Sequence, residues 1–502
     1  MPKSKIQQLI SGRLLALNTV YSLVGQGVPL LAAVFTIPIL IKEMGTDRFG
    51  ILTLAWMVVS YFSLFDLGLG RALTQLVAES IGKEEDENEI AKLIWTASFL
   101  MVGLGLIGSG LFIAISPWIV YSVLKLPQDL QQETLIGFRI LALSIPAVTI
   151  SAGFNGVLSA LQRFDLINAI RIPLGLFTFI GPLVALSFST HLAAVMIVLV
   201  VGRFIFGGIY CLACFRTMPL LREISFSREL ISPLLRFGSW MTMSNIVSPF
   251  MASMDRFLIG SVISITAVTY YTTPYELVTK VLIVPTALVS VLFPAFSTAF
   301  GTSSKKAGQI FDRGVKLTFL ILYPIIFLIV LFAPDGLNLW LGKEFALNSS
   351  SVLEWLAIGV LINGLAQVPF ALIQGIGRPD LTAKLHFIEL PIYAIALWHF
   401  TSTYGIVGAA YTWTFRVTLD FICLTLVSRH FLKRRLVPIN MIPFVLSASL
   451  TFLLPLMIFV DIEMINKTAL YSLILIVFLS VSWLIILTSE DKNTIKNFCK
   501  LY

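Results

Sequence analysis

The sequence contains little charge. Lys, Arg, Asp and Glu together make up 12% of the 502 residues, whereas hydrophobic residues make up 57%. Soluble domains carry roughly a quarter charged residues, so this composition excludes an ordinary water-soluble globular protein. Most of the chain is expected to contact hydrocarbon or other apolar helices.

Cysteine and histidine are also scarce, with four of each. Cys211 and Cys214 have CxxC spacing, but they lie on an apolar run without a βαβ pattern, so we expect packing residues and no redox pair. The histidines show no spacing typical of metal ligands. No Gly-rich nucleotide loop and no HExxH motif is present. The sequence therefore predicts neither a metal site nor nucleotide-dependent chemistry.

Long apolar runs dominate the chain. A transmembrane helix needs about 20 apolar residues, and the sequence predicts an all-α membrane protein with about fourteen spans. They lie near 15–41, 49–77, 93–115, 135–162, 166–188, 192–215, 237–263, 270–299, 314–334, 351–376, 382–402, 406–428, 441–461 and 468–488. The runs 49–77 and 270–299 are long enough to tilt, or to break at an internal Gly or Pro. The first run is too long for a signal-peptide core and lacks a small-residue cleavage site, so no cleavable signal is predicted.

The distribution of basic residues predicts the orientation. With a cytoplasmic N-terminus, 23 of the 35 Lys and Arg residues fall in cytoplasmic segments and five in external ones. Cytoplasmic loops of membrane proteins carry this excess, so both termini are expected in the cytoplasm. The net charge of +8 then reflects topology and contact with anionic membrane lipids, and no nucleic-acid partner is implied.

An internal duplication divides the chain. The segment from Leu158 to Leu166 contains Arg163-x-Asp165-Leu and reappears from Ile373 to Leu381 as Arg378-x-Asp380-Leu. Two matching pairs follow downstream, Arg203 with Arg416 and Arg216 with Arg429, and Asn18 corresponds to Asn245 upstream, each early in the first span of its half. Each repeat holds six spans, an even number. The two repeats therefore enter the membrane in the same direction and are expected to be related by a pseudo-two-fold axis along the membrane normal.

These repeats predict four parts. An N-terminal six-helix lobe covers 1–215, a cytoplasmic amphipathic linker 216–236, and a C-terminal six-helix lobe 237–436. Residues 437–502 hold two extra spans, expected to pack peripherally, and a cytoplasmic tail. A substrate cavity is expected between the lobes. The linker has an apolar stripe beside Arg228 and Arg236, which predicts a helix on the membrane surface, although a plain charged loop is the alternative.

Charged residues inside the predicted spans are the most informative feature. They are Asp66, Arg71, Arg139, Arg203, Asp255, Arg256, Glu276, Lys280 and Arg416. A charge in hydrocarbon costs several kcal/mol unless it faces a partner or a water-filled cavity. A chain with many such charges and little mass outside the bilayer is typical of a transporter for polar or charged substrates.

Two stretches resemble a known family. One runs through Gly25-Gln26-Gly27 and Ile37-Pro38 to Phe65-Asp66-Leu67-Gly68-Leu69-Gly70-Arg71, and the other through Arg236-Phe237-Gly238 and Asp255-Arg256-Phe257 to Leu292-Phe293-Pro294. They resemble the polysaccharide-transporter (Wzx-type O-antigen flippase) family of the multidrug/oligosaccharidyl-lipid/polysaccharide exporter superfamily. The resemblance covers most of the chain and is weakest over the last two spans.

This resemblance implies a flippase and not an enzyme. The implied substrate is an anionic oligosaccharide linked to undecaprenyl diphosphate, moved to the outer leaflet of a bacterial inner membrane by alternating access. The product would enter surface polysaccharide, such as O-antigen of lipopolysaccharide. A glycan polymerase and a chain-length regulator are the implied partners, and a proton or a sodium ion is the expected coupling ion, with no other cofactor. An ion-coupled multidrug antiporter of the same superfamily is the alternative.

Arginines are the best candidates for binding the diphosphate, because the planar guanidinium can contact phosphate through two nitrogens. The expected substrate-binding residues are Arg203, Arg139, Arg71, Arg416, Asn18 and Asn245. Arg203 lies near the middle of its span without an acidic residue three or four positions away. Two interpretations stay open for the others: Arg139 could reach the membrane interface, and Arg416 could pair with Asp420 at i+4.

The expected gating or coupling residues are Asp66, Asp255, Arg256, Glu276, Lys280, Glu354 and Glu389. Glu276 and Lys280 have i,i+4 spacing and could pair with each other. Glu354 and Glu389 are lone carboxylates, and either could carry a coupling proton, because burial raises the pKa of a carboxyl group. A salt bridge to an arginine on another span is the alternative.

A membrane-embedded glycosyltransferase or glycan polymerase is the main enzyme alternative. Such enzymes usually place acidic catalytic residues on a sizeable external loop. The longest external segments predicted here, about 116–134 and 335–350, are short and contain no carboxylate pair at useful spacing. The sequence therefore favours transport.

Overall fold

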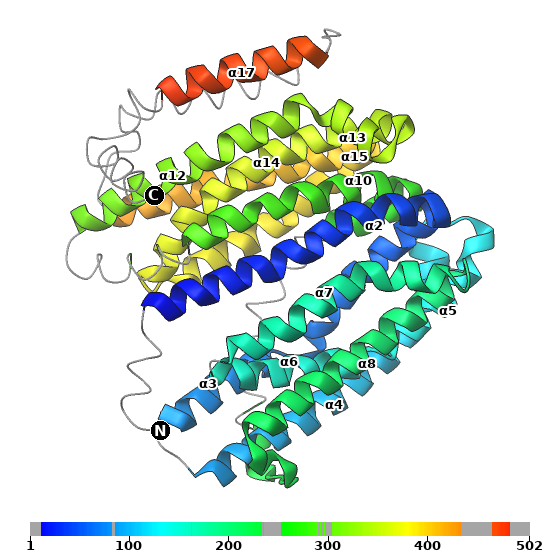
Figure 1. Ribbon diagram of the computed structural model, residues 1–502, viewed down its shortest axis with the longest axis vertical. Helices are drawn as coiled ribbons and strands as arrows, with labels where there is room; N and C mark the ends of the chain where they lie inside the picture. Colours follow the sequence, from blue (N-terminus) through cyan, green and yellow to red (C-terminus); the bar gives the residue numbers. More distant parts are fainter. Residues whose placement is uncertain are drawn as a thin grey trace. The chain divides into compact units, whose positions relative to one another are not determined.

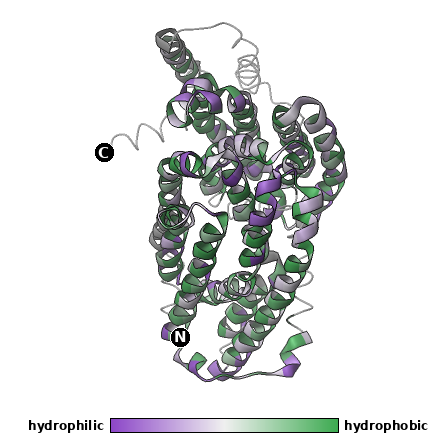
Figure 2. Ribbon diagram, turned by 90° about the vertical axis from the view of Figure 1, so that its right-hand side faces the viewer, coloured by the Kyte–Doolittle hydropathy of each residue, from purple (hydrophilic) through white to green (hydrophobic). Residues whose placement is uncertain are grey.

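The computed structural model describes residues 12–82, 86–161, 163–232, 253–289, 304–432 and 464–481, and the single positions 234, 251, 292 and 296. All regular structure in these residues is helical, as expected for chain in contact with lipid, where every backbone polar group needs an internal partner. Eight of the described helices are long and apolar enough to cross a membrane. Hydrophobic residues line most of the helical ribbon in Figure 2. The chain is a multi-pass membrane protein, and the total of fourteen spans stays a prediction.

The chain forms two compact units, Met1–Thr269 and Tyr270–Tyr502. The helices of unit 1 are α2 (Gly12–Tyr61), α3 (Leu69–Gly82), α4 (Glu87–Trp118), α5 (Gln128–Ala142), α6 (Ile145–Ala160), α7 (Phe164–Leu186) and α8 (Leu192–Thr217). Short helical turns are η1 (Phe62–Asp66), η2 (Ile119–Val123), η3 (Pro219–Arg222) and η4 (Arg228–Leu230). Helix α10 (Ile265–Thr279) contains the boundary between the units (Figure 1).

Unit 2 continues through η5 (Lys280–Leu282), α12 (Ser304–Leu331), α13 (Ala333–Leu341), α14 (Lys343–Gly375), α15 (Pro379–Phe431) and α17 (Met464–Val481). Helix α14 packs against α12, α13 and α15. Helix α17 lies along α12, where Phe478 stacks on Tyr323 with ring centroids 4.6 Å apart. Of the two extra predicted spans, 441–461 lies outside the described residues.

Two long helices each contain a sharp turn at a glycine. Helix α2 turns at Gly45 with φ 80°, and α15 turns at Gly405 with φ 63°. Glycine adopts positive φ without steric cost, and each turn separates two of the predicted spans. Helix α15 is therefore two helices, 379–404 and 406–431, that together form a hairpin in unit 2.

The break predicted within the run 49–77 is confirmed. The chain changes from α2 to η1 and then to α3, and Leu67 and Gly68 adopt positive φ values of 49° and 72°. The run 270–299 also changes geometry, at the 3-10 turn η5. Pro285 follows that turn and has no N–H to donate to the Val281 carbonyl, which explains a weakened helix at this point.

The two predicted Arg-x-Asp-Leu turns have the same structure. Arg163 donates to both oxygens of Asp165 at 2.9 and 2.8 Å, and Arg378 donates to both oxygens of Asp380 at 2.9 and 3.1 Å. The hydrogen bonds to these carboxylates raise the pKa of Arg163 and of Arg378. Each turn joins two helices, so the matching sequence segments correspond to matching local structures.

The segment after α8 is not one continuous helix between Pro219 and Leu230, whereas residues 231, 232 and 234, near the predicted apolar stripe, are helical. From Pro219 to Leu230 the chain forms the two short 3-10 turns η3 and η4, joined by extended residues. The Leu221 carbonyl accepts a hydrogen bond from the Trp95 ring nitrogen at 3.1 Å, so this part of the linker packs against α4. Position 233 and positions 235–250, which include the rest of the predicted linker, lie outside the described residues.

Candidate functional site

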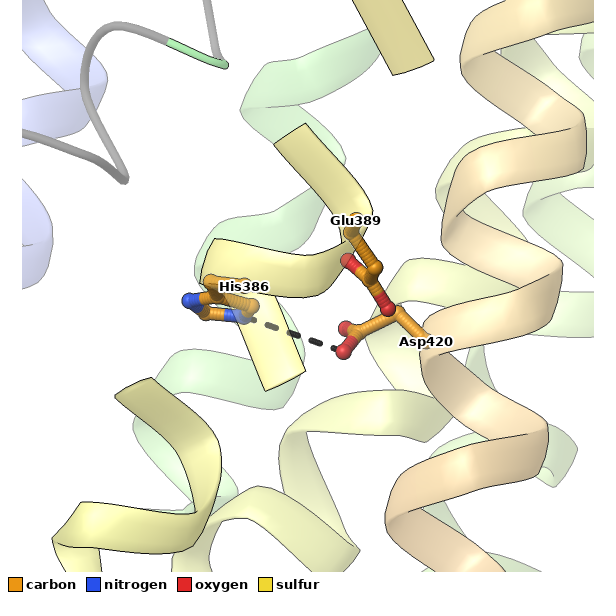
Figure 3. Close-up of side chains that lie close together, drawn as sticks. All are labelled: His386, Glu389 and Asp420. Atoms are coloured by element: carbon orange, nitrogen blue, oxygen red, sulfur yellow. Dashed lines mark ion pairs between the residues drawn. The ribbon is translucent and has the colours of Figure 1, made fainter. Parts of the chain in front are cut away.

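Helix α15 holds a cluster of ionisable side chains, His386, Glu389 and Asp420, which we call the α15 cluster (Figure 3). His386 and Glu389 are three residues apart and so lie on one face of the first half of α15. Asp420 comes from the second half and points toward them. One nitrogen or oxygen from each side chain lies within 4.8 Å of the other two. His386 Nε2 and Asp420 Oδ1 lie 3.7 Å apart.

The cluster lies well inside the α15 hairpin. Glu389 is about 15 Å from the start of α15 at 1.5 Å per residue, and Asp420 is about 16 Å from its end. Both ends lie at the open end of the hairpin. With that end at the membrane surface, as the predicted spans 382–402 and 406–428 require, both counts correspond to about half of a hydrocarbon core about 30 Å thick.

Both carboxylates of the cluster are buried. Glu389 is 7% exposed and Asp420 8% exposed. Neither Glu389 oxygen has a hydrogen-bond partner, and the same holds for Asp420 Oδ1. Burying an ionised carboxylate without partners is very costly, so these groups need either a bound cation or a proton.

Arg416 is the nearby permanent cation. It is among the groups that act electrostatically on Glu389. Its guanidinium lies over the Tyr393 ring at 5.4 Å, and its Nε is buried without a hydrogen-bond partner. Among the described residues, Arg416 and Asp420 form no ion pair, so the i,i+4 interpretation of Arg416 is wrong. Asp420 instead approaches His386.

Arg203 lies on the interior face of α8 in unit 1. Leu199, Phe206 and Tyr210 occupy the same helical stripe, and Phe206 and Tyr210 belong to the core that packs against α4 and α6. Arg203 is half-buried and about 16 Å from the start of α8. Within the described part of the chain no acidic side chain pairs with it. A role of Arg203 in substrate binding stays a prediction.

Two further arginines differ from Arg203. Arg139 is exposed and shares a stripe of α5 with Ile136 and Leu143, which are 44% and 53% exposed. An apolar exposed stripe is typical of a lipid-facing surface and favours the interpretation of Arg139 as an interfacial anchor. Arg171, which the candidate set omits, is exposed on α7 and acts electrostatically on the Tyr210 hydroxyl. Arg171 therefore adds a positive charge near the interior stripe of α8.

Asp66 stabilises the break between α2 and α3. Its carboxylate accepts hydrogen bonds from the Gly68 and Gly70 backbone N–H groups at 2.7 and 3.2 Å. The start of α3 would otherwise leave these donors without helical partners. The structure thus shows that Asp66 binds the local backbone. Its expected gating role stays a prediction.

Asp255 and Arg256 are both buried in unit 1, on the helical segment 253–263. The Tyr61 hydroxyl of α2 hydrogen-bonds Ser253 and lies within electrostatic reach of both charged residues. An apolar cavity of about 330 Å³ adjoins this contact and is lined by Tyr61, Phe65, Phe112 and Phe257, among others.

The remaining candidates separate into three groups. Glu276 and Lys280 form the predicted i,i+4 pair at 3.3 Å. Glu354 is 4% exposed within α14. Asn245 lies outside the described residues, and of Asn18 and Arg71 the structure describes the backbone, within α2 and α3.

This all-helical, multi-pass architecture with charges buried in its helices is that of a membrane transporter. The family model described as "Polysaccharide biosynthesis protein" matches residues 44–350, which is more than half of the chain. The chain belongs to this family. It is 30% identical over 409 residues to a Shigella flexneri protein named as an O-antigen transporter, covering 81% of this chain and 96% of that relative. It is 21% identical to the lipopolysaccharide biosynthesis protein WzxC of Escherichia coli, over 78% of this chain and 74% of the relative.

Solved structures give the same fold. The lipid II flippase MurJ in an inward closed conformation matches with a TM-score of 0.70 at 14% identity, over 93% of this chain and 99% of that one. An inward-facing multidrug transporter of the MATE family matches with a TM-score of 0.69 at 15% identity, over 82% of this chain and 94% of that one. At these identities the likeness establishes the fold alone.

Proposed function

We propose that this protein is a flippase for lipid-linked oligosaccharides. It moves repeat units carried on undecaprenyl diphosphate from the cytoplasmic to the outer leaflet of a bacterial inner membrane, by alternating access between two six-helix lobes. Family membership and the Shigella relative named for O-antigen transport support this assignment. Both termini lie in the cytoplasm, and a glycan polymerase and chain-length regulator act on the product.

The observation that carries the proposal is Arg203. An anionic diphosphate crosses a low-dielectric path only with difficulty unless fixed positive charge is present. Arg203 supplies such a charge at mid-helix on the interior face of α8. Arg71, Arg416, Asn18 and Asn245 are the further proposed substrate contacts, whereas Arg139, on an exposed apolar stripe of α5, is proposed as an interfacial anchor.

The conformational cycle needs gating and coupling residues as well. We assign these roles to Asp66, Asp255, Arg256, Glu276, Lys280, Glu354 and Glu389. A proton or sodium ion supplies the driving force in this scheme. A multidrug antiporter, the second candidate, is favoured by the MATE-like fold but would need an acidic cavity for cationic substrates.

The test compares Arg203→Gln with Arg139→Gln. Purified protein in liposomes is given a fluorescent diphosphate-linked oligosaccharide, and the outer-leaflet fraction is measured against time. Loss of one or two charge-assisted hydrogen bonds, each worth about 1.5–3 kcal/mol, predicts at least a tenfold slower rate for Arg203→Gln. Arg139→Gln is expected to stay within about twofold of wild type, because its stripe faces lipid.

Two results would reject the proposal. If Arg203→Gln flips the lipid at the wild-type rate and at equal protein level, the residue is structural. If the wild type leaves the lipid in place but exports a lipophilic cation, the protein is an antiporter.

A further inference from the structure

We propose that the α15 cluster holds one exchangeable proton, shared among His386, Glu389 and Asp420, and that exchange of this proton drives lipid transport. This inference rests on the proposed flippase function and names its coupling ion and the residues that bind it. It follows from charge balance, donor chemistry and the hairpin geometry of α15.

The cluster lacks one positive charge. Glu389 and Asp420 contribute two negative charges, and Arg416 contributes one positive charge. Among the described residues, the groups that act electrostatically on Glu389 are Asp420, Arg416 and His386. Cys423 also lies near both carboxylates, and as a thiol it adds no charge to this count. A net charge at mid-membrane is costly, so one bound monovalent cation makes the group stable.

The donor set favours a proton over a metal ion. Alkali and alkaline-earth cations prefer shells of oxygen ligands, and imidazole is a poor ligand for them. A divalent ion such as zinc suits imidazole but would leave the cluster with an excess positive charge beside Arg416. Imidazole is the side chain that ordinarily titrates near neutral pH. The three side chains lie within 4.8 Å of one another, so the proposed proton is shared by the group as a whole.

The hairpin gives the proton site a switch. The His386 side chain is 19% exposed and the Asp420 side chain 11% exposed, so the imidazole is the less buried of the two. His386 and Asp420 lie on opposite halves of α15, on either side of the Gly405 turn. An increase in the separation of these halves lengthens the 3.7 Å contact and weakens the hold on the proton. A conformational change of this hairpin is thereby coupled to proton release.

The experiment uses the full-length protein in liposomes with a pH difference across the membrane. With one proton exchanged per lipid, the equilibrium ratio of lipid between leaflets shifts about tenfold for each pH unit. Glu389→Gln and Asp420→Asn are expected to abolish the pH-dependent shift of the lipid ratio. His386→Gln is expected to reduce this shift and to change the pH at which the lipid ratio responds half-maximally. Glu89→Gln, in an exposed ion pair of α4, is the control and keeps the full shift.

Further measurements separate the alternatives. Proton release is followed with a pH dye in weakly buffered detergent without any lipid substrate, so the site can be tested even if flipping fails. If the wild-type protein does not flip the lipid, the proposed function is rejected. If the wild-type protein flips the lipid and Glu389→Gln responds to pH as the wild type does, the proton site is overturned. A response to a sodium gradient at equal pH, or micromolar zinc binding lost in His386→Gln, also overturns it. If Glu389→Gln fails to fold, the proposal is tested with His386→Gln, which replaces a partly exposed side chain, and with the dye measurement of proton release.

Discussion

Replacing Asp66 with alanine tests whether the break in the second predicted span depends on one side chain. The carboxylate accepts hydrogen bonds from Gly68 N and Gly70 N, and alanine would leave both donors without this acceptor inside the membrane. Each buried donor left unsatisfied costs about 1–3 kcal/mol, so the loss of stability is expected to be about 2–6 kcal/mol. Asp66→Asn keeps one acceptor oxygen and should lose about half as much.

The assay is unfolding of the purified protein by denaturing detergent, with helix content as the signal. Asp165→Asn is the matched control, because it removes a carboxylate from an exposed pair and should cost less than about 1 kcal/mol. If Asp66→Ala unfolds like the wild type, the two hydrogen bonds do not hold the break. Flipping adds a second criterion: a backbone role predicts partial activity in Asp66→Asn, whereas a role in carrying charge predicts none.

Two further substitutions probe helix packing and the hydrogen-bond network around Glu133. Gly156→Ala would place a Cβ onto the Gly70 carbonyl oxygen, so we expect less folded protein by size-exclusion chromatography. Gly103→Ala is the control and should fold normally, because no atom lies within 4 Å of its added Cβ. Equal yields of the two variants would contradict the close α3–α6 contact. Glu133→Gln removes the charge that accepts from Arg48 at 3.2 and 3.1 Å and from the Leu192 backbone N–H. It should cost about 1–3 kcal/mol in the same detergent unfolding assay, and an unchanged midpoint would show that the network adds no stability.

Much of the fold could be predicted because the membrane restricts it. The features that could be predicted are local in sequence: apolar runs of helix length, glycines between them and the repeated Arg-x-Asp-Leu motif. Local features can be recognised without knowing which residues are in contact. The break at Asp66-Leu67-Gly68 followed from the same kind of signal. The ends of the helices were harder to predict. Helix α5 begins at Gln128, several residues before the predicted span that starts at 135.

The candidate site was harder to predict for a specific reason. Glu389 was identified as a lone carboxylate, but its neighbours His386 and Asp420 were not joined to it. Asp420 is distant in sequence and meets the others only because α15 folds back at Gly405. The i,i+4 spacing suggested that Arg416 pairs with Asp420, but spacing only makes such a pair possible. In the structure Arg416 lies over the Tyr393 ring and Asp420 approaches His386. Reading the two α15 segments as a hairpin, with positions counted from the glycine turn, could have revealed the cluster.

The twin turns at Arg163 and Arg378 have a consequence for how this chain is held at the membrane surface. Each arginine donates through Nε and Nη2 to the aspartate two residues later. This pairing occupies one two-nitrogen face of each guanidinium and offsets its charge, so these arginines are weaker ligands for lipid phosphates than unpaired ones, although they count toward the basic residues on the predicted cytoplasmic side. The predicted orientation of the chain then depends mainly on the remaining lysines and arginines. Removing either aspartate would add an anionic-lipid contact at the helix junction without changing the number of basic residues.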